Sequence, residues 1–175
     1  MIFGLAQTSR TKPRSAGRQL YAAAVRQARA PVLYAQMGAP DTTEGRFELL
    51  TQHVILLVEA LHNRGDGARA SSQALFDAYV SDLDGALREM GVGDLTVGKR
   101  MRALGGAFYG RAEAYRKAFA ELPGTQALEA LIERTVTPSG GDPAALAAYV
   151  VRCRENLASA DTDALLEAGP SWPQC

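Results

Sequence analysis

Metal binding is the first chemistry to consider, because histidine and cysteine are frequent metal ligands. The chain has two residues of each type, His53, His62, Cys153 and Cys175. Their spacings contain no close pair of the kind that zinc sites use. Two cysteines also provide no disulfide framework, and a domain of 175 residues does not need one. We therefore expect no metal site, and the cysteine usage favours a reducing compartment.

Catalytic motifs are not found in the sequence either. It has no Gly-x-Ser-x-Gly, no Gly-x-x-x-x-Gly-Lys-Ser and no His-Glu-x-x-His. Asp82 and Asp84 are two positions apart, which places them on different faces of a helix instead of side by side. Asp84 is instead spaced to pair with Arg88 at i, i+4. We expect neither an enzyme nor a bound cofactor.

His53 lies in an apolar stretch beside Leu49, Leu50 and Leu56. Two interpretations are open for it. One is a core histidine held by hydrogen bonds, and the other is a member of a small-molecule pocket in an enzyme. A polar-lined cavity next to His53 would support the pocket, and a sealed environment would remove it.

The segment from Asp94 to Phe119 predicts a long helix with a continuous apolar core stripe. At 100° per residue, the opposite face carries seven residues. They are Lys99, Arg102, Gly106, Tyr109, Gly110, Glu113 and Lys117. Each glycine inside a helix costs about 1 kcal/mol relative to alanine, and the close approach of another helix would offset that cost. The second helix belongs either to this domain or to another protein, and the sequence leaves both open.

Apolar residues recur at helical spacing along nearly the whole chain, which predicts an all-α fold: a single-domain bundle of about six to eight helices. We expect helices over about 15–29, 31–37, 43–63, 72–90, 94–119, 126–136 and 143–157, and a terminal turn at 163–167. Gly91 is placed to end one helix, and Asp94 and Asp142 to begin others. A basic flexible arm (1–14), a helical domain (15–168) and a tail (169–175) complete the expected organisation.

The net charge is zero, but its distribution is uneven. The first 30 residues carry six basic side chains and no acidic one. They are Arg10, Lys12, Arg14, Arg18, Arg26 and Arg29. This segment is either a solvated arm and first helix, or a surface for anionic lipid, RNA or the ribosome. The longest apolar region, around Leu49 to Val58, is too short to cross a bilayer, which takes about 20 residues. The start of the chain does not have the charged-then-apolar order of a secretory signal, and an organelle transit peptide stays open.

Short motifs between Leu20 and Phe119 are more particular than helix formation requires. They are Tyr34, Pro40-Asp41-Thr42, Gly45-Arg46-Phe47-Glu48-Leu49, His53, Leu75-Phe76-Asp77, Asp82-Leu83-Asp84, the run from Leu87 to Leu95, Val97-Gly98-Lys99, Phe108-Tyr109-Gly110-Arg111 and Tyr115. With these motifs the chain resembles the ubiquinol-cytochrome c chaperone family in its bacterial form. The part after Leu122 carries little of the resemblance.

The resemblance implies a non-enzymatic assembly factor for ubiquinol-cytochrome c reductase. The implied client is newly made cytochrome b, handled at the cytoplasmic side of the inner membrane by a cytoplasmic or peripheral protein. Mitochondrial members are implied to hold this client near the ribosome exit, together with a small partner protein. Whether this chain needs a second subunit stays open. We expect nine residues to bind the partner: Asp84, Arg88, Lys99, Arg102, Gly106, Tyr109, Gly110, Arg111 and Lys117.

Overall fold

The chain folds around α3 (Thr43–Leu61), whose sequence is apolar on almost every side. Val54, Ile55, Leu56 and Leu57 are all at most 2% exposed, so neighbouring helices cover this part of α3 all round. A Thr42 side chain that accepts a hydrogen bond from the Gly45 N–H caps its first turn. The helix predicted over about 43–63 is confirmed, and it lies at the centre of the fold.

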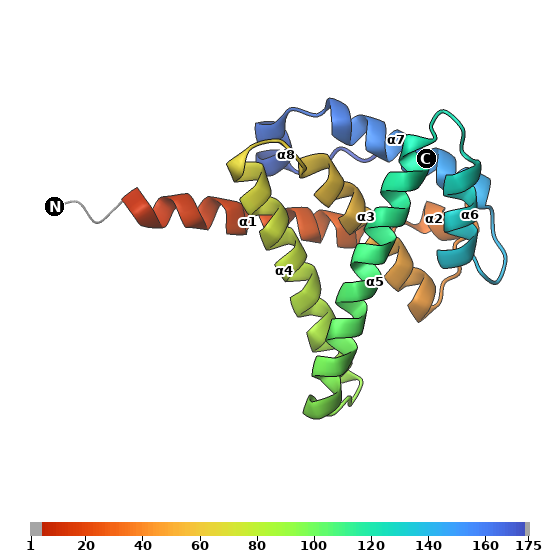
Figure 1. Cartoon of the computed structure of the whole chain (residues 1–175), viewed down its shortest axis with the longest axis horizontal. Coiled ribbons are helices and arrows are strands. Elements are labelled where there is room, and N and C mark those ends of the chain that lie inside the picture. Colours follow the sequence, from red (N-terminus) through yellow and green to blue (C-terminus); the bar gives the residue numbers. More distant parts are fainter. Residues whose placement is uncertain (1–4, 174–175) are drawn as a thin grey trace.

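A computed structural model describes residues 5–173, and within this range every regular element is a helix (Figure 1). The other elements are α1 (Leu5–Ala28), α2 (Pro31–Ala35), α4 (Asp66–Glu89), α5 (Asp94–Ala120), α6 (Gln126–Thr135), α7 (Pro143–Ser159) and α8 (Thr162–Ala168). The all-α bundle predicted from the sequence is confirmed. Among the described residues, no helix is long and apolar enough to cross a membrane.

α1 and α4 cross closely, and a glycine makes the contact. A Cβ atom built on Gly17 would lie 2.5 Å from the Ala74 Cβ and 2.6 Å from the Leu75 backbone nitrogen. Such distances leave no room for any side chain at position 17. At this crossing α1 packs against α4, and α4 also packs against α5.

α4 and α5 form a hairpin that extends away from the other helices (Figure 1). Gly91 ends α4 with φ +77°, a left-handed conformation that glycine adopts without strain. The Gly91 N–H donates to the Arg88 carbonyl and the Val92 N–H donates to the Leu87 carbonyl. This is the Schellman pattern, so the predicted role of Gly91 is confirmed.

Some predicted helix starts were wrong. α1 begins at Leu5 instead of Ser15, so most of the expected arm is helical, and residues 1–4 lie outside the described part. Pro13 lies inside this helix, although its ring removes one backbone donor and disfavours a helix locally. α4 begins at Asp66 instead of Ser72.

Asp94 was expected to cap α5, but Gly93 takes that position without a side-chain hydrogen bond, and the Asp94 carboxylate pairs with Arg88 instead. The short turn between α4 and α5 brings Arg88 and Asp94 close enough to form this pair. Asp142, by contrast, accepts a hydrogen bond from the Ala145 N–H and caps α7 as predicted.

Candidate partner-binding surface

The side of α5 that faces away from the core carries six of the predicted site residues, which we call the α5 outer face. They are Lys99, Arg102, Gly106, Tyr109, Gly110 and Lys117. All six are exposed, and Tyr109 is 62% exposed, a high value for a large hydrophobic side chain. A Cβ atom at Gly106 or Gly110 would meet no atom within 4 Å. The interpretation in which these glycines admit a helix of this same domain is therefore wrong.

Aromatic residues on the opposite side of α5 pack against α4. Phe108 and Tyr115 are at most 3% exposed. The Phe108 ring lies 4.9 Å from that of Phe76 and 5.5 Å from that of Tyr79, both on α4. The apolar stripe predicted from the sequence thus forms the inner side of α5, and the rotation of this helix is set by residues other than those of the outer face.

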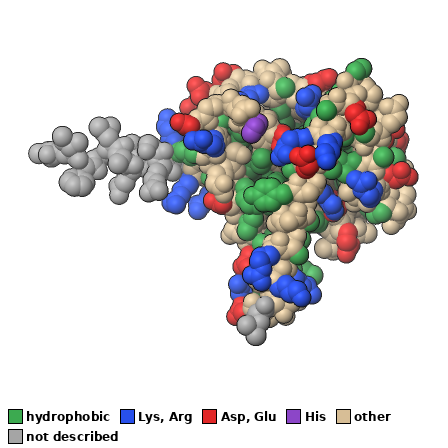
Figure 2. Space-filling view, viewed as in Figure 1, with side chains coloured by type: hydrophobic (Ala, Val, Ile, Leu, Met, Phe, Trp, Pro, Cys, Tyr) green, Lys and Arg blue, Asp and Glu red, His purple; other side chains and the backbone are tan. Residues whose placement is uncertain are grey.

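Charge on the α5 outer face is confined to its two ends. Lys99, Arg100 and Arg102 near the first end are exposed, and Lys117 at the other lies 3.7 Å from Glu113. Between Arg102 and Glu113 the exposed residues are uncharged: Ala103, Gly106, Ala107, Tyr109 and Gly110. Figure 2 shows basic side chains near the tip of the hairpin and hydrophobic ones above them. The face is thus a bare uncharged strip with basic ends.

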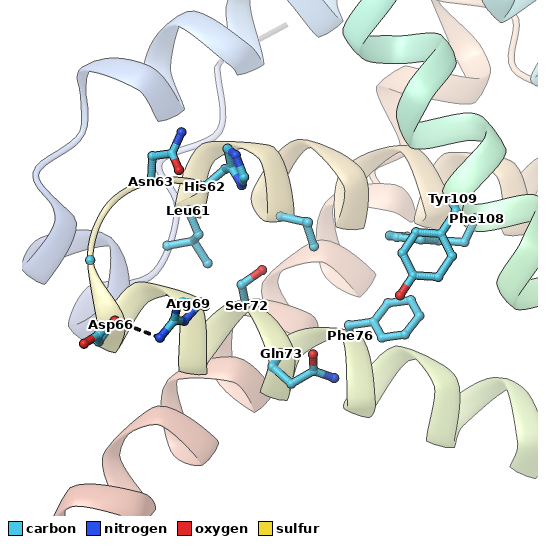
Figure 3. A pocket seen from close by; sticks show the side chains of 12 residues that line it. Leu61, His62, Asn63, Asp66, Arg69, Ser72, Gln73, Phe76, Phe108 and Tyr109 are labelled. Carbon is cyan, nitrogen blue, oxygen red and sulfur yellow. Dashed lines mark hydrogen bonds and ion pairs between the residues drawn. The ribbon is translucent and has the colours of Figure 1, made fainter.

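A cleft of about 550 Å³ opens beside Tyr109, between the C-terminal end of α3, the first half of α4 and α5 (Figure 3). Leu61, Phe76, Phe108 and Tyr109 contribute apolar surface to it, and polar side chains of α4 and of the loop that precedes it stand at its edge. Nothing in the local sequence predicts this cleft, because its walls come from three separate helices.

Asp84 and Arg88 form the predicted i, i+4 pair, with Arg88 Nε 2.7 Å from a carboxylate oxygen of Asp84. Arg88 also pairs with Asp94 across the turn. Both carboxylates raise the pKa of the Arg88 guanidinium, with Asp84 contributing first. Asp84 and Arg88 lie on α4, where the pair with Asp94 links the two helices of the hairpin. The structure therefore separates Asp84 and Arg88 from the α5 outer face.

The structure also places Arg111 away from the α5 outer face, although it was predicted to join the same site. Its guanidinium makes two contacts with the carboxylate of Glu48 on α3, one of them at 2.6 Å. This hydrogen bonding raises the pKa of Arg111. Glu48 is 9% exposed. A carboxylate within so apolar a helix was a signal that a basic partner must approach it.

His53 is completely buried, with both ring nitrogens in hydrogen bonds. Nδ1 lies 2.7 Å from the Leu49 carbonyl oxygen and Nε2 lies 2.8 Å from the Tyr149 hydroxyl. Burial lowers the pKa of His53 to about 4. The Trp172 ring packs edge-on against the imidazole at 5.1 Å. The core-histidine interpretation is confirmed, and the sealed environment removes the enzyme pocket around His53.

A second apolar groove, of about 410 Å³, lies between the hairpin and the body of the protein, where sequence reasoning had placed no site. Phe47, Leu50, Leu83 and Leu87 line it, and Met90 at its edge is 70% exposed. Its signal in the sequence was the apolar face of α4, which continues beyond the part that α3 covers.

The basic start of the chain meets acidic side chains of α4. Three exposed arginines of the α1 region and three carboxylates of α4 line one open cleft between the two helices. These are Arg14, Arg18 and Arg29, with Asp77, Asp82 and Glu89. Tyr21 bridges the cleft, its hydroxyl donating to Asp82 at 2.5 Å. The negative charge of these carboxylates partly cancels the positive charge of the arginines, which weakens the attraction of this surface for a polyanion.

Taken together, these features define a helical binding protein. Within residues 5–173 no group of three or more His, Cys, Asp or Glu residues is arranged to hold a metal ion. The one buried histidine is fully hydrogen-bonded, and the open features are a bare helix face and apolar clefts. Such surfaces bind other proteins.

Comparison with known proteins identifies the family. The family model described as ubiquinol-cytochrome C chaperone matches residues 35–172, so the chain belongs to this family. A solved structure, the crystal structure of the Cbp3 homolog from Brucella abortus, is 33% identical with a TM-score of 0.87. The alignment covers 99% of this chain and 97% of that one. A comparison with curated proteins found no match. The family is one of assembly chaperones for ubiquinol-cytochrome c reductase, and membership implies a non-enzymatic role.

Proposed function

We propose that this protein binds newly made cytochrome b during assembly of ubiquinol-cytochrome c reductase, and that the α5 outer face is the docking surface. Family membership supports the role in assembly. The observation that carries the surface is the open space over Gly106 and Gly110, where a Cβ atom would meet nothing within 4 Å. Two costly glycines in an uncovered helix are explained by a partner that covers them.

The chemistry of the client suits this surface. Cytochrome b must present apolar helices before its partner subunits arrive, and apolar helices associate closely where small residues let their backbones approach. The uncharged strip between Arg102 and Glu113 lies within ten positions, 103–112, about 15 Å of helix at 1.5 Å per residue. The basic side chains at either end suit polar or acidic ends of a client segment. In this proposal the protein acts at the cytoplasmic side of the inner membrane, as a cytoplasmic or peripheral protein.

Substitution of the glycines tests the surface. Gly106→Leu and Gly110→Leu each add a side chain into open space, so folding is kept or improved, by up to about 1 kcal/mol per site from helix propensity. The same bulk blocks close approach of a client helix, and recovery of cytochrome b with the purified protein should fall. Gly85→Leu is the matched control, because Gly85 lies in open space on α4, away from α5.

Thermal melts and co-purification decide the outcome. A loss of stability in the Gly106 or Gly110 variants would mean that the face is packed internally. Stable variants that still hold cytochrome b at the normal level would remove α5 as the docking surface. Contact of the basic residues of α1 with the ribosome or with anionic lipid remains a separate prediction, as does the need for a second chaperone subunit.

A further inference from the structure

The cleft beside Tyr109 has an aromatic wall that stands open to solvent. The Phe76 ring lies 4.9 Å from that of Phe108 and 5.8 Å from that of Tyr109. The Phe108 and Tyr109 rings meet edge to face at 5.9 Å. Val58 and Leu61 of α3 extend this apolar surface on the other side of the cleft. An aromatic or leucine side chain entering the cleft would contact rings and aliphatic groups, which favours apolar burial.

The edge of the cleft is polar, and its ion pair is internal. Asp66 and Arg69 bond to each other at 2.9 Å (Figure 3). Asn63 and Ser72 supply an amide and a hydroxyl group at the same edge, together with the His62 imidazole and the Gln73 amide, whose nitrogen donates to Asp77 at 2.7 Å. A charged side chain would therefore lose water without gaining an opposite charge that is free to receive it. Charge complementarity therefore favours an uncharged occupant. The polar groups at the edge can form hydrogen bonds with backbone groups next to that side chain.

The cleft is continuous with the α5 outer face. Tyr109 forms part of the cleft wall and also stands at the middle of the uncharged strip between Arg102 and Glu113. A helix that lies over Gly106 and Gly110 must therefore pass next to the mouth of the cleft. One of its side chains can turn into the cleft while its backbone stays close to the glycines.

We infer that this cleft is a socket for one bulky, uncharged side chain, aromatic or leucine, carried by the client helix that docks on α5. The inference rests on the proposed function and adds a specificity element to the same site. In this arrangement the glycines admit any apolar helix with a small-residue face, whereas the socket selects a helix with a large side chain at the correct register.

Filling the socket from α4 tests this inference. Ser72 is half-buried and points into the cleft (Figure 3), so Ser72→Trp occupies the space without changing α5. Ala70→Trp is the matched control, because Ala70 is exposed and lies two positions away, on the other side of the same helix. Burial of one leucine or phenylalanine corresponds to about 10-fold to 150-fold in affinity. We expect Ser72→Trp to lower cytochrome b recovery at least about tenfold, and Ala70→Trp to leave it unchanged.

Two further measurements keep the test decisive. If Ser72→Trp does not fold, Gln73→Glu places a carboxylate at the exposed edge without filling the packed wall. This charge has no new partner at Asp77, to which Gln73 donates at 2.7 Å, and the variant should lower recovery in the same way. A photo-crosslinking benzophenone side chain at position 73 should attach to a large apolar residue of a membrane-spanning segment of cytochrome b. The same group at position 70 should not attach to this residue.

The results separate the socket from the docking surface. If Gly106→Leu abolishes recovery while folded Ser72→Trp and Gln73→Glu retain it, the socket is wrong and the proposed function stands. Cross-linking from position 73 to a charged loop of cytochrome b would overturn the stated occupant. If neither the Gly106 variant nor the socket variants lower recovery, the proposed docking surface itself fails.

Discussion

The ion pair between Arg111 and Glu48 tests how α5 is attached to the core. Arg111 was predicted from its motif to bind a partner, yet its side chain is only 29% exposed and that of Glu48 only 11%. Arg111→Met keeps most of the apolar stem and removes the charge. Glu48 would then remain as a carboxylate in a largely apolar setting, with its two guanidinium hydrogen bonds lost.

The magnitude follows from this degree of burial. Removing one partner of a fully buried pair costs about 3–5 kcal/mol, and partial exposure of Arg111 lets water screen part of the loss. We expect Arg111→Met to lower the free energy of unfolding by about 2–3 kcal/mol. For a chain of this length each kcal/mol corresponds to about 2–4 °C, so the melting temperature should fall by about 4–12 °C.

A double-mutant cycle with Glu48→Gln isolates the pair. The double variant has no unpaired charge, so it should lose less stability than the two single variants added together, by about 1 kcal/mol or more. Urea unfolding of the four proteins measures this coupling, and co-purification measures cytochrome b recovery per folded molecule. An Arg111→Met protein that melts at the same temperature as the parent would refute the argument. A stable variant that loses cytochrome b would make Arg111 a contact residue.

Two further perturbations test the core. Acidification from pH 6.5 to about pH 4 should cost about 3 kcal/mol through His53, because burial lowers its folded pKa to about 4 and the unfolded chain takes up the proton first. Urea unfolding across this range should show a smaller loss for His53→Gln, and equal losses would contradict the assignment. Gly17→Ala should lower the melting temperature despite better helix propensity, since its Cβ would lie 2.5 Å from that of Ala74, an overpacking cost of about 1–3 kcal/mol. Gly85→Ala, in open space, should raise the melting temperature, and an increase for both variants would refute the close crossing.

The helices were predictable because apolar periodicity reports which side of each helix is buried. The stripe through Phe108, Ala112 and Tyr115 is buried as predicted. The starts of α1 and α4 were missed because Pro13 and Gly67 disfavour a helix locally, and packing of α1 against α4 outweighs those preferences.

The candidate site was predictable only in part. Periodicity correctly grouped Gly106, Tyr109 and Gly110 on one face, but a glycine pair has the same spacing whether another helix of the domain covers it or not. That difference depends on where the remaining helices lie. The cleft beside Tyr109 was not predictable at all, since Leu61, Phe76 and Tyr109 come together only in the folded chain.

The polar residues of α3 explain why the α5 outer face points outward. Apolar packing is not directional and would tolerate some rotation of α5 about its axis. Hydrogen bonds are directional, and α3 offers Glu48 and Gln52 one turn apart. Arg111 donates to Glu48 and the Tyr115 hydroxyl donates to Gln52 at 2.9 Å, so two residues one turn apart on α5 meet two residues one turn apart on α3.

This two-point attachment sets the rotation of α5. Turning the helix by one residue, 100°, would break both hydrogen bonds and leave buried polar groups without partners, at about 1–3 kcal/mol for each neutral group and more for the carboxylate. With Arg111 and Tyr115 held inward, Gly106 and Gly110 must face solvent. The polar residues Glu48 and Gln52 of α3 therefore determine which face of α5 is open to solvent, and this is the face that we propose as the docking surface.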